Sequence, residues 1–421
     1  MTEAALATKA HPDSRPMDAR YARRLIVILT ITFGIVFFDR NAMNFLAPFV
    51  AAELHLNNTQ ISALTAVLAL TWAISGLVVG RVADVGGRRK VILIACVVLF
   101  AVSSFLSGLA TSFIMLAGAR LLMGASEGGV LPVSQTFVAL ETSERSRGLF
   151  MGLVQNFGTH LLGSFAAPLI LVAIAEAWGW RPAFFVAGVP GLVCAILIAI
   201  FVREPARSGE ALQASDSTGI SIRQALSSRN LFVCVALATL MICWIALGWI
   251  FYPLYMTQIR AFTPTAMSVQ MSVLGLSAVA GSFLIPGLSD RLGRKPVLAV
   301  CCAIGIACPL AALYFQGSFW ALAAIIAAGW LCASGTFPLF ISIVPSESVP
   351  ASAMATAIGL MLGVGEVFGG FLGPIGAGMS ADKFGLAAPL WIQFALALAA
   401  GLLALFLLET APIAKARAPK P

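Results

Sequence analysis

Residues 80–90 read GRVADVGGRRK, and residues 286–295 read PGLSDRLGRK. In both stretches an Asp is followed three residues later by a Gly and then by two basic residues, and the copies lie 206 residues apart, about half of the chain. This spacing predicts a tight, charged turn between two helices. Two ordinary basic loops would explain the Lys and Arg but not the matched Asp and Gly. The repetition therefore predicts two related halves.

The composition places both halves in a membrane. Of the 421 residues, 60% are apolar and only 10% are charged, whereas soluble domains carry about 25% charged residues. Because a helix needs ~20 apolar residues to cross a bilayer, the apolar content corresponds to about twelve spans. Apolar runs of this length exclude an outer-membrane β-barrel, whose strands have only about 9–11 residues, and a soluble enzyme with a single anchor.

The apolar runs divide the chain into six spans, a polar stretch and six further spans. We expect the spans near 23–50, 60–82, 91–110, 112–138, 147–173, 182–202, 229–257, 265–289, 296–315, 318–344, 352–379 and 385–408. The predicted organisation is a cytoplasmic tail (1–20), a six-helix bundle (21–202), a cytoplasmic linker (203–228), a second six-helix bundle (229–410) and a cytoplasmic tail (411–421). The sequence thus predicts an all-α integral membrane protein.

The positions of the basic residues assign a side to each loop. Short cytoplasmic loops accumulate Lys and Arg, and with the amino terminus inside, 21 of the 26 basic residues fall on the cytoplasmic side. We therefore expect both termini in the cytoplasm and a first span that directs insertion. The net charge of +8 then reflects membrane topology, and no nucleic-acid partner is expected.

The eight cysteines lie in apolar runs without metal-ligand spacing, so neither disulfides nor a metal are expected.

Five charged residues fall deep inside the expected spans, namely Asp39, Arg40, Arg120, Glu127 and Glu366. Each costs roughly 2.5–3.5 kcal/mol at the membrane centre, so we expect them to face a cavity and to pair. Arg120 and Glu127 lie on one helix face, about 10.5 Å apart along the axis, and Gly124 between them leaves room for a ligand or another backbone.

The chemistry of these groups suggests a division of roles. A guanidinium stays charged and presents a planar fork that matches a carboxylate, so Arg40 and Arg120 are the expected ligands of a substrate anion. A carboxylate in a low-dielectric cavity can take up a proton near neutral pH, so Asp39 and Glu127 are the expected proton carriers. The alternative is that these acids only neutralise the arginines in static ion pairs that hold helices together.

Further candidates come from both halves. Phe37 and Asn44 share a face of the first span with Arg40. Glu366 lies on a Gly-rich span and is either a substrate or proton group of the second half or a helix-packing hydrogen-bond partner. His160 is a packed residue or a proton relay. The remaining expected substrate-binding residues are Trp72, Gln155, Asn156, Trp249 and Tyr252. Trp249 and Tyr252 lie in an aromatic-rich span and either line the cavity or belong to a belt at the membrane interface.

The whole chain resembles the major facilitator superfamily, in which an Asp-x-x-Gly-Arg-Arg loop joins two spans. The resemblance implies twelve transmembrane helices in two pseudo-symmetric six-helix bundles, with Pro286 replacing the equivalent of Gly80 in the second loop. The expected cytoplasmic gate motif consists of Gly80, Asp84, Gly87, Arg88, Arg89, Asp290, Gly293, Arg294 and Lys295.

Within that superfamily, FFDRNAMN (37–44), EGG (127–129) and GWRPAFF (179–185) resemble the anion:cation symporters, which include bacterial sugar-acid carriers such as the galactonate transporter. The resemblance implies proton-coupled uptake of a small organic anion by a monomer in the bacterial inner membrane, without a cofactor. It also implies functional roles for Asp39, Arg40, Arg120 and Glu127. Phe37 stands where the sugar-acid carriers have a Tyr.

Three other functions compete with uptake of an anion. A major facilitator efflux carrier or facilitator for apolar or aromatic compounds would have no need for two intramembrane arginines. A receptor without transport would usually carry a sizeable soluble domain. An intramembrane enzyme could use the two acids, but the sequence shows no Walker loop, GxSxG or HExxH, and nothing else in it assembles a catalytic site, so no catalytic residues are expected.

Overall fold

The computed structural model describes residues 19–204, 228–350 and 353–411. The predicted tails and nearly all of the predicted linker lie outside the described residues. Within the described residues, all regular structure is helical, and twelve helices are long and apolar enough to cross a membrane. The predicted all-α class and the twelve spans are therefore confirmed.

The first half contains six spans, several of which are broken. A broken first span is formed by α1 (Ala19–Arg40) and α2 (Ala42–Leu54), and two continuous spans by α3 (Asn58–Gly86) and α4 (Arg89–Gly108). The fourth and fifth spans comprise α5 (Phe113–Glu127), α6 (Val130–Glu141), α7 (Glu144–Gly152), the π-helical η1 (Leu153–Phe157) and η2 (Thr159–Ala166), and α8 (Ala167–Trp178). The last is α9 (Trp180–Phe201).

The second half repeats this pattern. It begins with α11 (Arg229–Gln258) and α12 (Pro264–Leu292), followed by α13 (Arg294–Gly305) and α14 (Ala307–Tyr314) in one span. The next two spans comprise α15 (Phe319–Gly335), η4 (Leu339–Ile343), α16 (Val344–Ser348), α17 (Met354–Val364), the π-helical η6 (Gly365–Leu372) and α18 (Gly373–Phe384). The last span is α19 (Ala387–Ala404).

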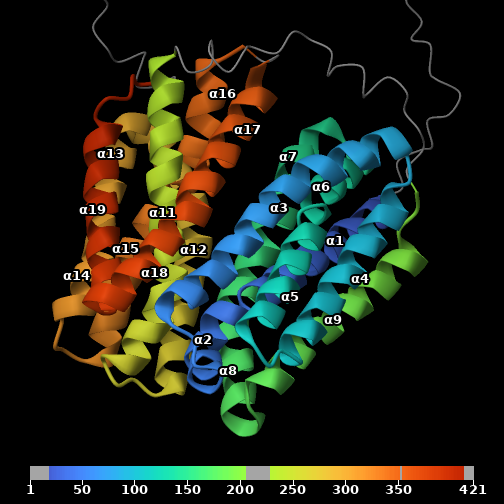
Figure 1. Ribbon diagram of the computed structural model, residues 1–421. Helices are drawn as coiled ribbons and strands as arrows, with labels where there is room; N and C mark the ends of the chain where they lie inside the picture. Colours follow the sequence, from blue (N-terminus) through green and yellow to red (C-terminus); the bar gives the residue numbers. More distant parts are fainter. Residues whose placement is uncertain (1–18, 205–227, 351–352, 412–421) are drawn as a thin grey trace, which may run out of the picture.

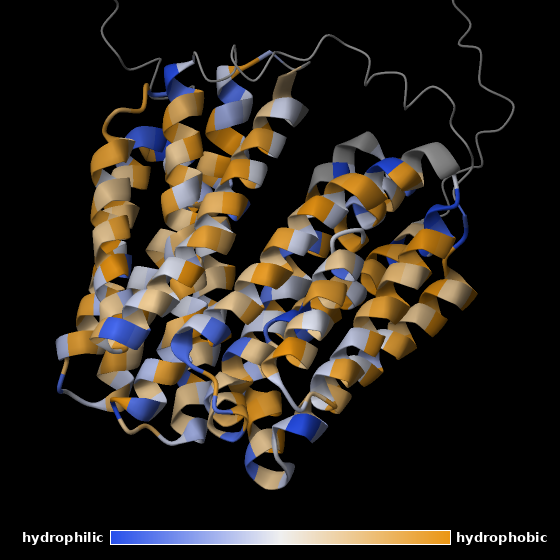
Figure 2. Ribbon diagram, in the orientation of Figure 1, coloured by the Kyte–Doolittle hydropathy of each residue, from blue (hydrophilic) through white to orange (hydrophobic). Residues whose placement is uncertain are grey.

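The two bundles lie side by side and diverge toward one face (Figure 1). We name this the terminal face, because α1 begins and α19 ends there, and we name the opposite face, where α2 ends and α3 begins, the distal face. The main contacts between the bundles join α3 to η6 and α18, α12 to η2 and α8, and α2 to α11. Mostly apolar ribbons run along the helices, with strongly hydrophilic stretches at their ends (Figure 2).

The repeated loops have the same local structure. Gly87 and Gly293 both have positive φ, 61° and 106°, a conformation that favours glycine. The helix that follows each loop is capped by a carboxylate from the last span of its own half. The backbone N–H groups of Arg89 and Lys90 donate to Glu204 at 2.8 and 2.9 Å, where a helix N-terminus favours negative charge.

In the second half, the backbone N–H groups of Arg294 and Lys295 donate to Glu409 in the same way, at 2.8 and 3.2 Å. The Arg294 side chain also donates to Glu347 at 2.9 Å and to Ser289 at 2.6 Å, tying the loop to α16. Glu204 and Glu409 were not among the predicted gate residues, although each closely follows the last apolar run of its half. The side chain of Asp84 lies outside the described residues.

On the distal face, Asp382 of α18 joins the two bundles. One carboxylate oxygen accepts a hydrogen bond from the Asn58 N–H at 2.8 Å, and the other accepts from the Thr59 N–H at 3.0 Å and the Thr59 hydroxyl at 2.5 Å. Asn58 and Thr59 form the first turn of α3, so Asp382 fills the anion-favouring N-terminus of a helix from the opposite bundle. This contact must break if the distal face opens.

Replacing Asp382 is expected to loosen this contact. In Asp382→Ala the first amides of α3 lose their acceptor, and because one such hydrogen bond contributes about 1 kcal/mol, their hydrogen exchange should accelerate roughly fivefold. Exchange measured by mass spectrometry on a peptide covering residues 56–66 tests this. Lys383→Ala, one residue along the same helix, is the matched control and should exchange like the wild type. Equal exchange in all three proteins would contradict the contact.

Candidate substrate site

The first span breaks where its charged residues lie. α1 ends at Arg40, α2 begins at Ala42, and Asn41 between them donates its side-chain N–H to the Gly163 carbonyl of η2 at 3.0 Å. Gly163 is needed at this crossing, because a Cβ there would lie 2.6 Å from the Cβ of Phe37. The break places Arg40 at the carbonyl end of α1, which favours positive charge.

Arg40 lies between two aromatic rings. Its guanidinium is 5.3 Å from the ring centroid of Phe37 and 5.0 Å from that of Trp72, distances that allow cation–π attraction. The Nη1 atom lies 3.8 Å from Glu127 Oε2, too far for a hydrogen bond, and has no hydrogen-bond partner among the described residues. This Nη1 atom is buried, whereas 16% of the Arg40 side chain as a whole is exposed, so other parts of the side chain can be reached by an anion.

Asp39 and Arg120 lie inside the first bundle, both fully buried. Asp39 accepts a hydrogen bond from the Ser104 hydroxyl at 2.7 Å, and Arg120 donates to the Ser107 hydroxyl at 3.4 Å. The Arg120 guanidinium lies 5.0 Å from the ring centroid of Phe184 and interacts electrostatically with Asp39. The structure therefore gives the two arginines different surroundings, because only Arg40 is partly exposed.

Glu127 connects the two arginines. It is fully buried, and neither of its carboxylate oxygens has a hydrogen-bond partner in the described part of the chain. Besides the 3.8 Å approach to Arg40, it interacts electrostatically with Arg120 and Asp39. The four charges of the first bundle thus form one network that ends at Arg40.

Gly124 does not leave room for a ligand. A Cβ at this position would lie 2.1 Å from the hydroxyl of Thr71 and 2.4 Å from the carbonyl oxygen of Leu68. Of the two alternatives for the space beside Gly124, the structure therefore shows another backbone, that of α3.

Asn44 of α2 is buried against α3, where its side-chain oxygen accepts a hydrogen bond from the Thr65 hydroxyl at 3.1 Å.

The second bundle contributes Glu366, which lies in the first turn of η6. Its side chain is half-buried and interacts electrostatically with Arg40 of the other bundle. Gln155 and Asn156 lie in η1, exposed and half-buried respectively, and His160 lies in η2. These four candidates all occur in π-helical segments, which are frequent at functional sites. The sequence carried no recognised signal for these segments.

Trp249 and Tyr252 have different surroundings. Trp249 is half-buried and packs edge-on against Phe45 of the first bundle, with ring centroids 6.0 Å apart. Tyr252 is fully buried within the second bundle, 6.2 Å from the ring centroid of Trp330, and its hydroxyl lacks a hydrogen-bond partner among the residues described. Trp249 is therefore placed at the interface between the bundles, and Tyr252 is in the core.

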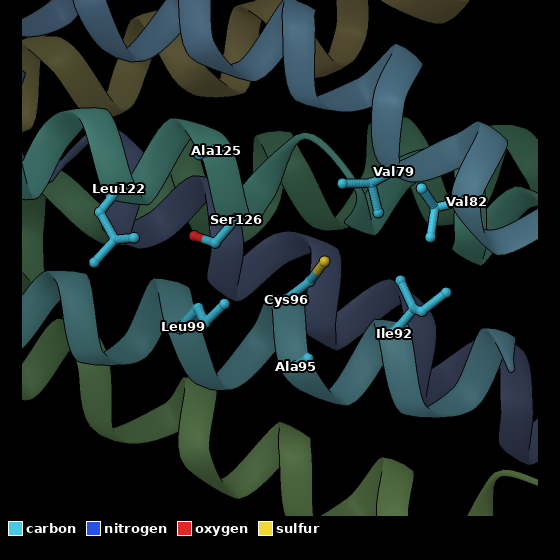
Figure 3. A pocket seen from close by; sticks show the side chains of 9 residues that line it. All are labelled: Val79, Val82, Ile92, Ala95, Cys96, Leu99, Leu122, Ala125 and Ser126. Carbon is cyan, nitrogen blue, oxygen red and sulfur yellow. The ribbon is translucent and has the colours of Figure 1, made fainter. Parts of the chain in front are cut away.

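A separate groove lies between α3, α4 and α5 (Figure 3). It is lined by Val79, Val82, Ile92, Ala95, Cys96, Leu99, Leu122, Ala125 and Ser126. Since none of these side chains is charged, the groove does not provide the chemistry that an anion requires.

Comparison with known proteins identifies the class. The sequence profile described as the Major Facilitator Superfamily matches residues 29–374 and, in an overlapping match, residues 249–421. The chain therefore belongs to the Major Facilitator Superfamily, and it is a secondary transporter of this type rather than an enzyme. The predicted resemblance to this superfamily is confirmed.

Similar proteins include carriers of organic anions. A probable sulfoacetate transporter of Cupriavidus necator is 26% identical over 286 residues, 64% of this chain and 65% of that protein. The hexuronate transporter of Bacillus subtilis is 26% identical over 378 residues, 86% of this chain and 88% of that protein. A solved bacterial homologue of the human lysosomal transporter Spinster has a TM-score of 0.73 at 20% identity, over 92% of this chain and 96% of that chain, which shows the shared fold.

The close packing at Gly124 predicts a selective loss of stability. Gly124→Ala places a methyl group against the α3 backbone, and overpacking of this kind costs about 1–3 kcal/mol. The apparent Tm of the purified protein in detergent should fall by several degrees. Gly118→Ala on the same helix, where a Cβ would have no neighbour within 4 Å, is the control and should leave the Tm unchanged or slightly higher. Equal Tm values for the two variants would refute this packing.

Proposed function

We propose that this transporter takes up a small organic anion, a sugar acid or other small carboxylate, together with protons. The observation that carries the proposal is the state of Arg40, whose charge is held between two rings while its Nη1 group lacks a hydrogen-bond partner among the described residues. Glu127 lies 3.8 Å away without a hydrogen bond, so the charge of Arg40 is only partly compensated, which is costly inside a membrane protein. A carboxylate ligand would relieve that cost through charge-assisted hydrogen bonds.

The distribution of basic residues supports an orientation. The terminal face carries many basic residues, among them Arg88, Arg294 and Lys295. The distal face carries few, among them Arg181, Arg260 and Lys383. Under the positive-inside rule the terminal face is cytoplasmic and the distal face is external. The bundles diverge at the terminal face (Figure 1) and are joined at the distal face by Asp382, so we infer an inward-facing state. The proposed location is the bacterial inner membrane.

The charge network supports coupling to protons. When Glu127 is ionised, it competes with the substrate for the positive charge of Arg40, 3.8 Å away. When Glu127 is protonated, that competition disappears, so proton and anion binding favour each other. Asp39, which pairs electrostatically with Arg120 in the buried interior, is the second proposed proton group. Arg120 then acts on the substrate through the network, since its side chain has no exposed surface.

The names of the similar proteins agree with an anionic substrate. Sulfoacetate and hexuronate are organic anions, and both carriers align with this chain at 26% identity. An efflux carrier for apolar compounds would not require a partly exposed arginine held between two aromatic rings. The anion:cation symporters remain the proposed subgroup.

Transport by proteoliposomes tests this function. Radiolabelled hexonates, dicarboxylates and aromatic acids would be offered to purified protein under an inward proton gradient. We expect one class to accumulate, and Arg40→Ala to lose uptake roughly tenfold or more, because a hydrogen bond to a charged group contributes about 1.5–3 kcal/mol. Arg40→Lys keeps the charge but not the fork and should retain part of the activity.

Glu127→Gln separates coupling from binding. It mimics the protonated acid, so counterflow exchange should persist while accumulation driven by the gradient disappears. Failure of every anion to enter the vesicles, or uptake by Arg40→Ala equal to wild type, would rule out the proposed function.

A further inference from the structure

The two repeats place different polar residues at one equivalent position. The 206-residue offset of the loops also relates His160 of η2 to Glu366 of η6. The same offset relates Gly163 to Gly369, and the structure supports this match. A Cβ at Gly163 would meet Phe37, and a Cβ at Gly369 would meet Cys243, which lies 206 residues after Phe37. The register of the two π-helical segments is therefore the same.

Both segments lie at the interface between the bundles. η2 packs against α12 of the second bundle, and η6 packs against α3 of the first. On η6, Gly365 and Gly369 form the side that contacts α11, because Cβ atoms there would lie 2.6 Å from Ile242 and 2.5 Å from the Thr239 carbonyl oxygen. α3 carries Trp72, which flanks Arg40. η6 thus lies at the interface that α3 shares with the second bundle, where Glu366 is near enough to Arg40 to interact electrostatically with it.

The Glu366 carboxylate has no hydrogen bond or ion pair within 4 Å among the described residues, although it interacts electrostatically with Arg40. One of its oxygens lies only 2.4 Å from the position that a Cβ at Gly370 would occupy, so the side chain is folded along η6 over this glycine. The side chain is only half-buried, and its oxygens are not among the buried polar atoms that lack a partner, so they are accessible to a ligand. An ionised carboxylate has no proton to donate, so Glu366 can only accept hydrogen bonds.

We propose that Glu366 binds hydroxyl groups of the substrate at the end away from the carboxylate that Arg40 holds. The inference rests on the proposed function and narrows it to hydroxylated organic anions. The Arg40 guanidinium on the first bundle binds the carboxylate end of the substrate. The Glu366 carboxylate on the second bundle accepts hydrogen bonds from the hydroxyl groups at the other end. A substrate held at both ends would also bridge the two bundles. A site built to accept hydroxyls discriminates strongly against analogues that lack them.

Paired ligands test the proposal by isothermal titration of the purified full chain. Gluconate is compared with hexanoate, and 4-hydroxybenzoate with benzoate, so that each pair differs only in hydroxyl groups. For any pair that binds, the affinity of the wild type for the hydroxylated member should be roughly tenfold higher, or more, than for the other member. In Glu366→Leu this preference should fall to about twofold or less. The affinity for the member without hydroxyls should not fall, because the variant removes a carboxylate that interacts with Arg40.

Gly370→Ala provides a second variant that keeps the charge. Its methyl group takes the place of a Glu366 oxygen and should reduce the preference by displacing the carboxylate. Gly363→Ala, where a Cβ has no neighbour within 4 Å, is the matched control and should retain the wild-type preference. Glu366→Gln keeps an acceptor oxygen and should retain part of it.

The outcomes separate this inference from the proposed function. An equal preference in wild type and Glu366→Leu, with binding abolished by Arg40→Ala, would overturn the role of Glu366 and leave anion transport intact. A Glu366→Leu variant that keeps the preference but loses coupling to the proton gradient would also overturn it, because Glu366 would then be a proton group. Absence of binding by all four carboxylates would overturn both proposals.

Discussion

A charged side chain within the hydrocarbon region needs an opposite charge, and the first bundle is arranged around that requirement. Arg120 is buried with Asp39, Glu127 interacts with Arg120 and approaches Arg40, and Arg40 ends the series between the rings of Phe37 and Trp72. The helices that supply these groups are α1, α3 and α5, and Gly124 lets α5 approach α3 closely enough. Close packing of these helices therefore encloses the network everywhere except at Arg40, whose side chain is partly exposed.

The two halves share a scaffold but have different chemistry. Their repeated loops are alike down to the carboxylates of Glu204 and Glu409 that cap the following helices. In contrast, four of the five charged residues expected inside the spans belong to the first half, and only Glu366 belongs to the second. This asymmetry suits a carrier that binds one end of its substrate to each bundle, since relative movement of the bundles can then open either face around the same ligand.

Much of the fold followed from sequence because it depends on local properties. The length of the apolar runs predicted the transmembrane spans, and the matched Asp-to-Gly spacing in the two loops predicted two related halves. The surroundings of the individual charges could not be obtained in this way, because they depend on contacts between distant segments. Helical spacing puts Arg120 and Glu127 on one face, but only packing shows that Arg120 is enclosed and that Arg40 is partly exposed. The break at Asn41 depends on a hydrogen bond to Gly163, and the π-helical segments likewise have no simple residue signature.

The central claim is that Glu127 and the substrate anion compete for Arg40, so that anion binding is linked to proton uptake. The direct measurement is the number of protons taken up when an anion binds to the purified carrier, obtained by titration calorimetry in buffers with different heats of ionisation. The account predicts net proton uptake in the wild type near neutral pH and a clear decrease in Glu127→Gln, which still binds the anion. Anion binding without proton uptake across the pH range, or the same uptake in wild type and Glu127→Gln, would contradict it.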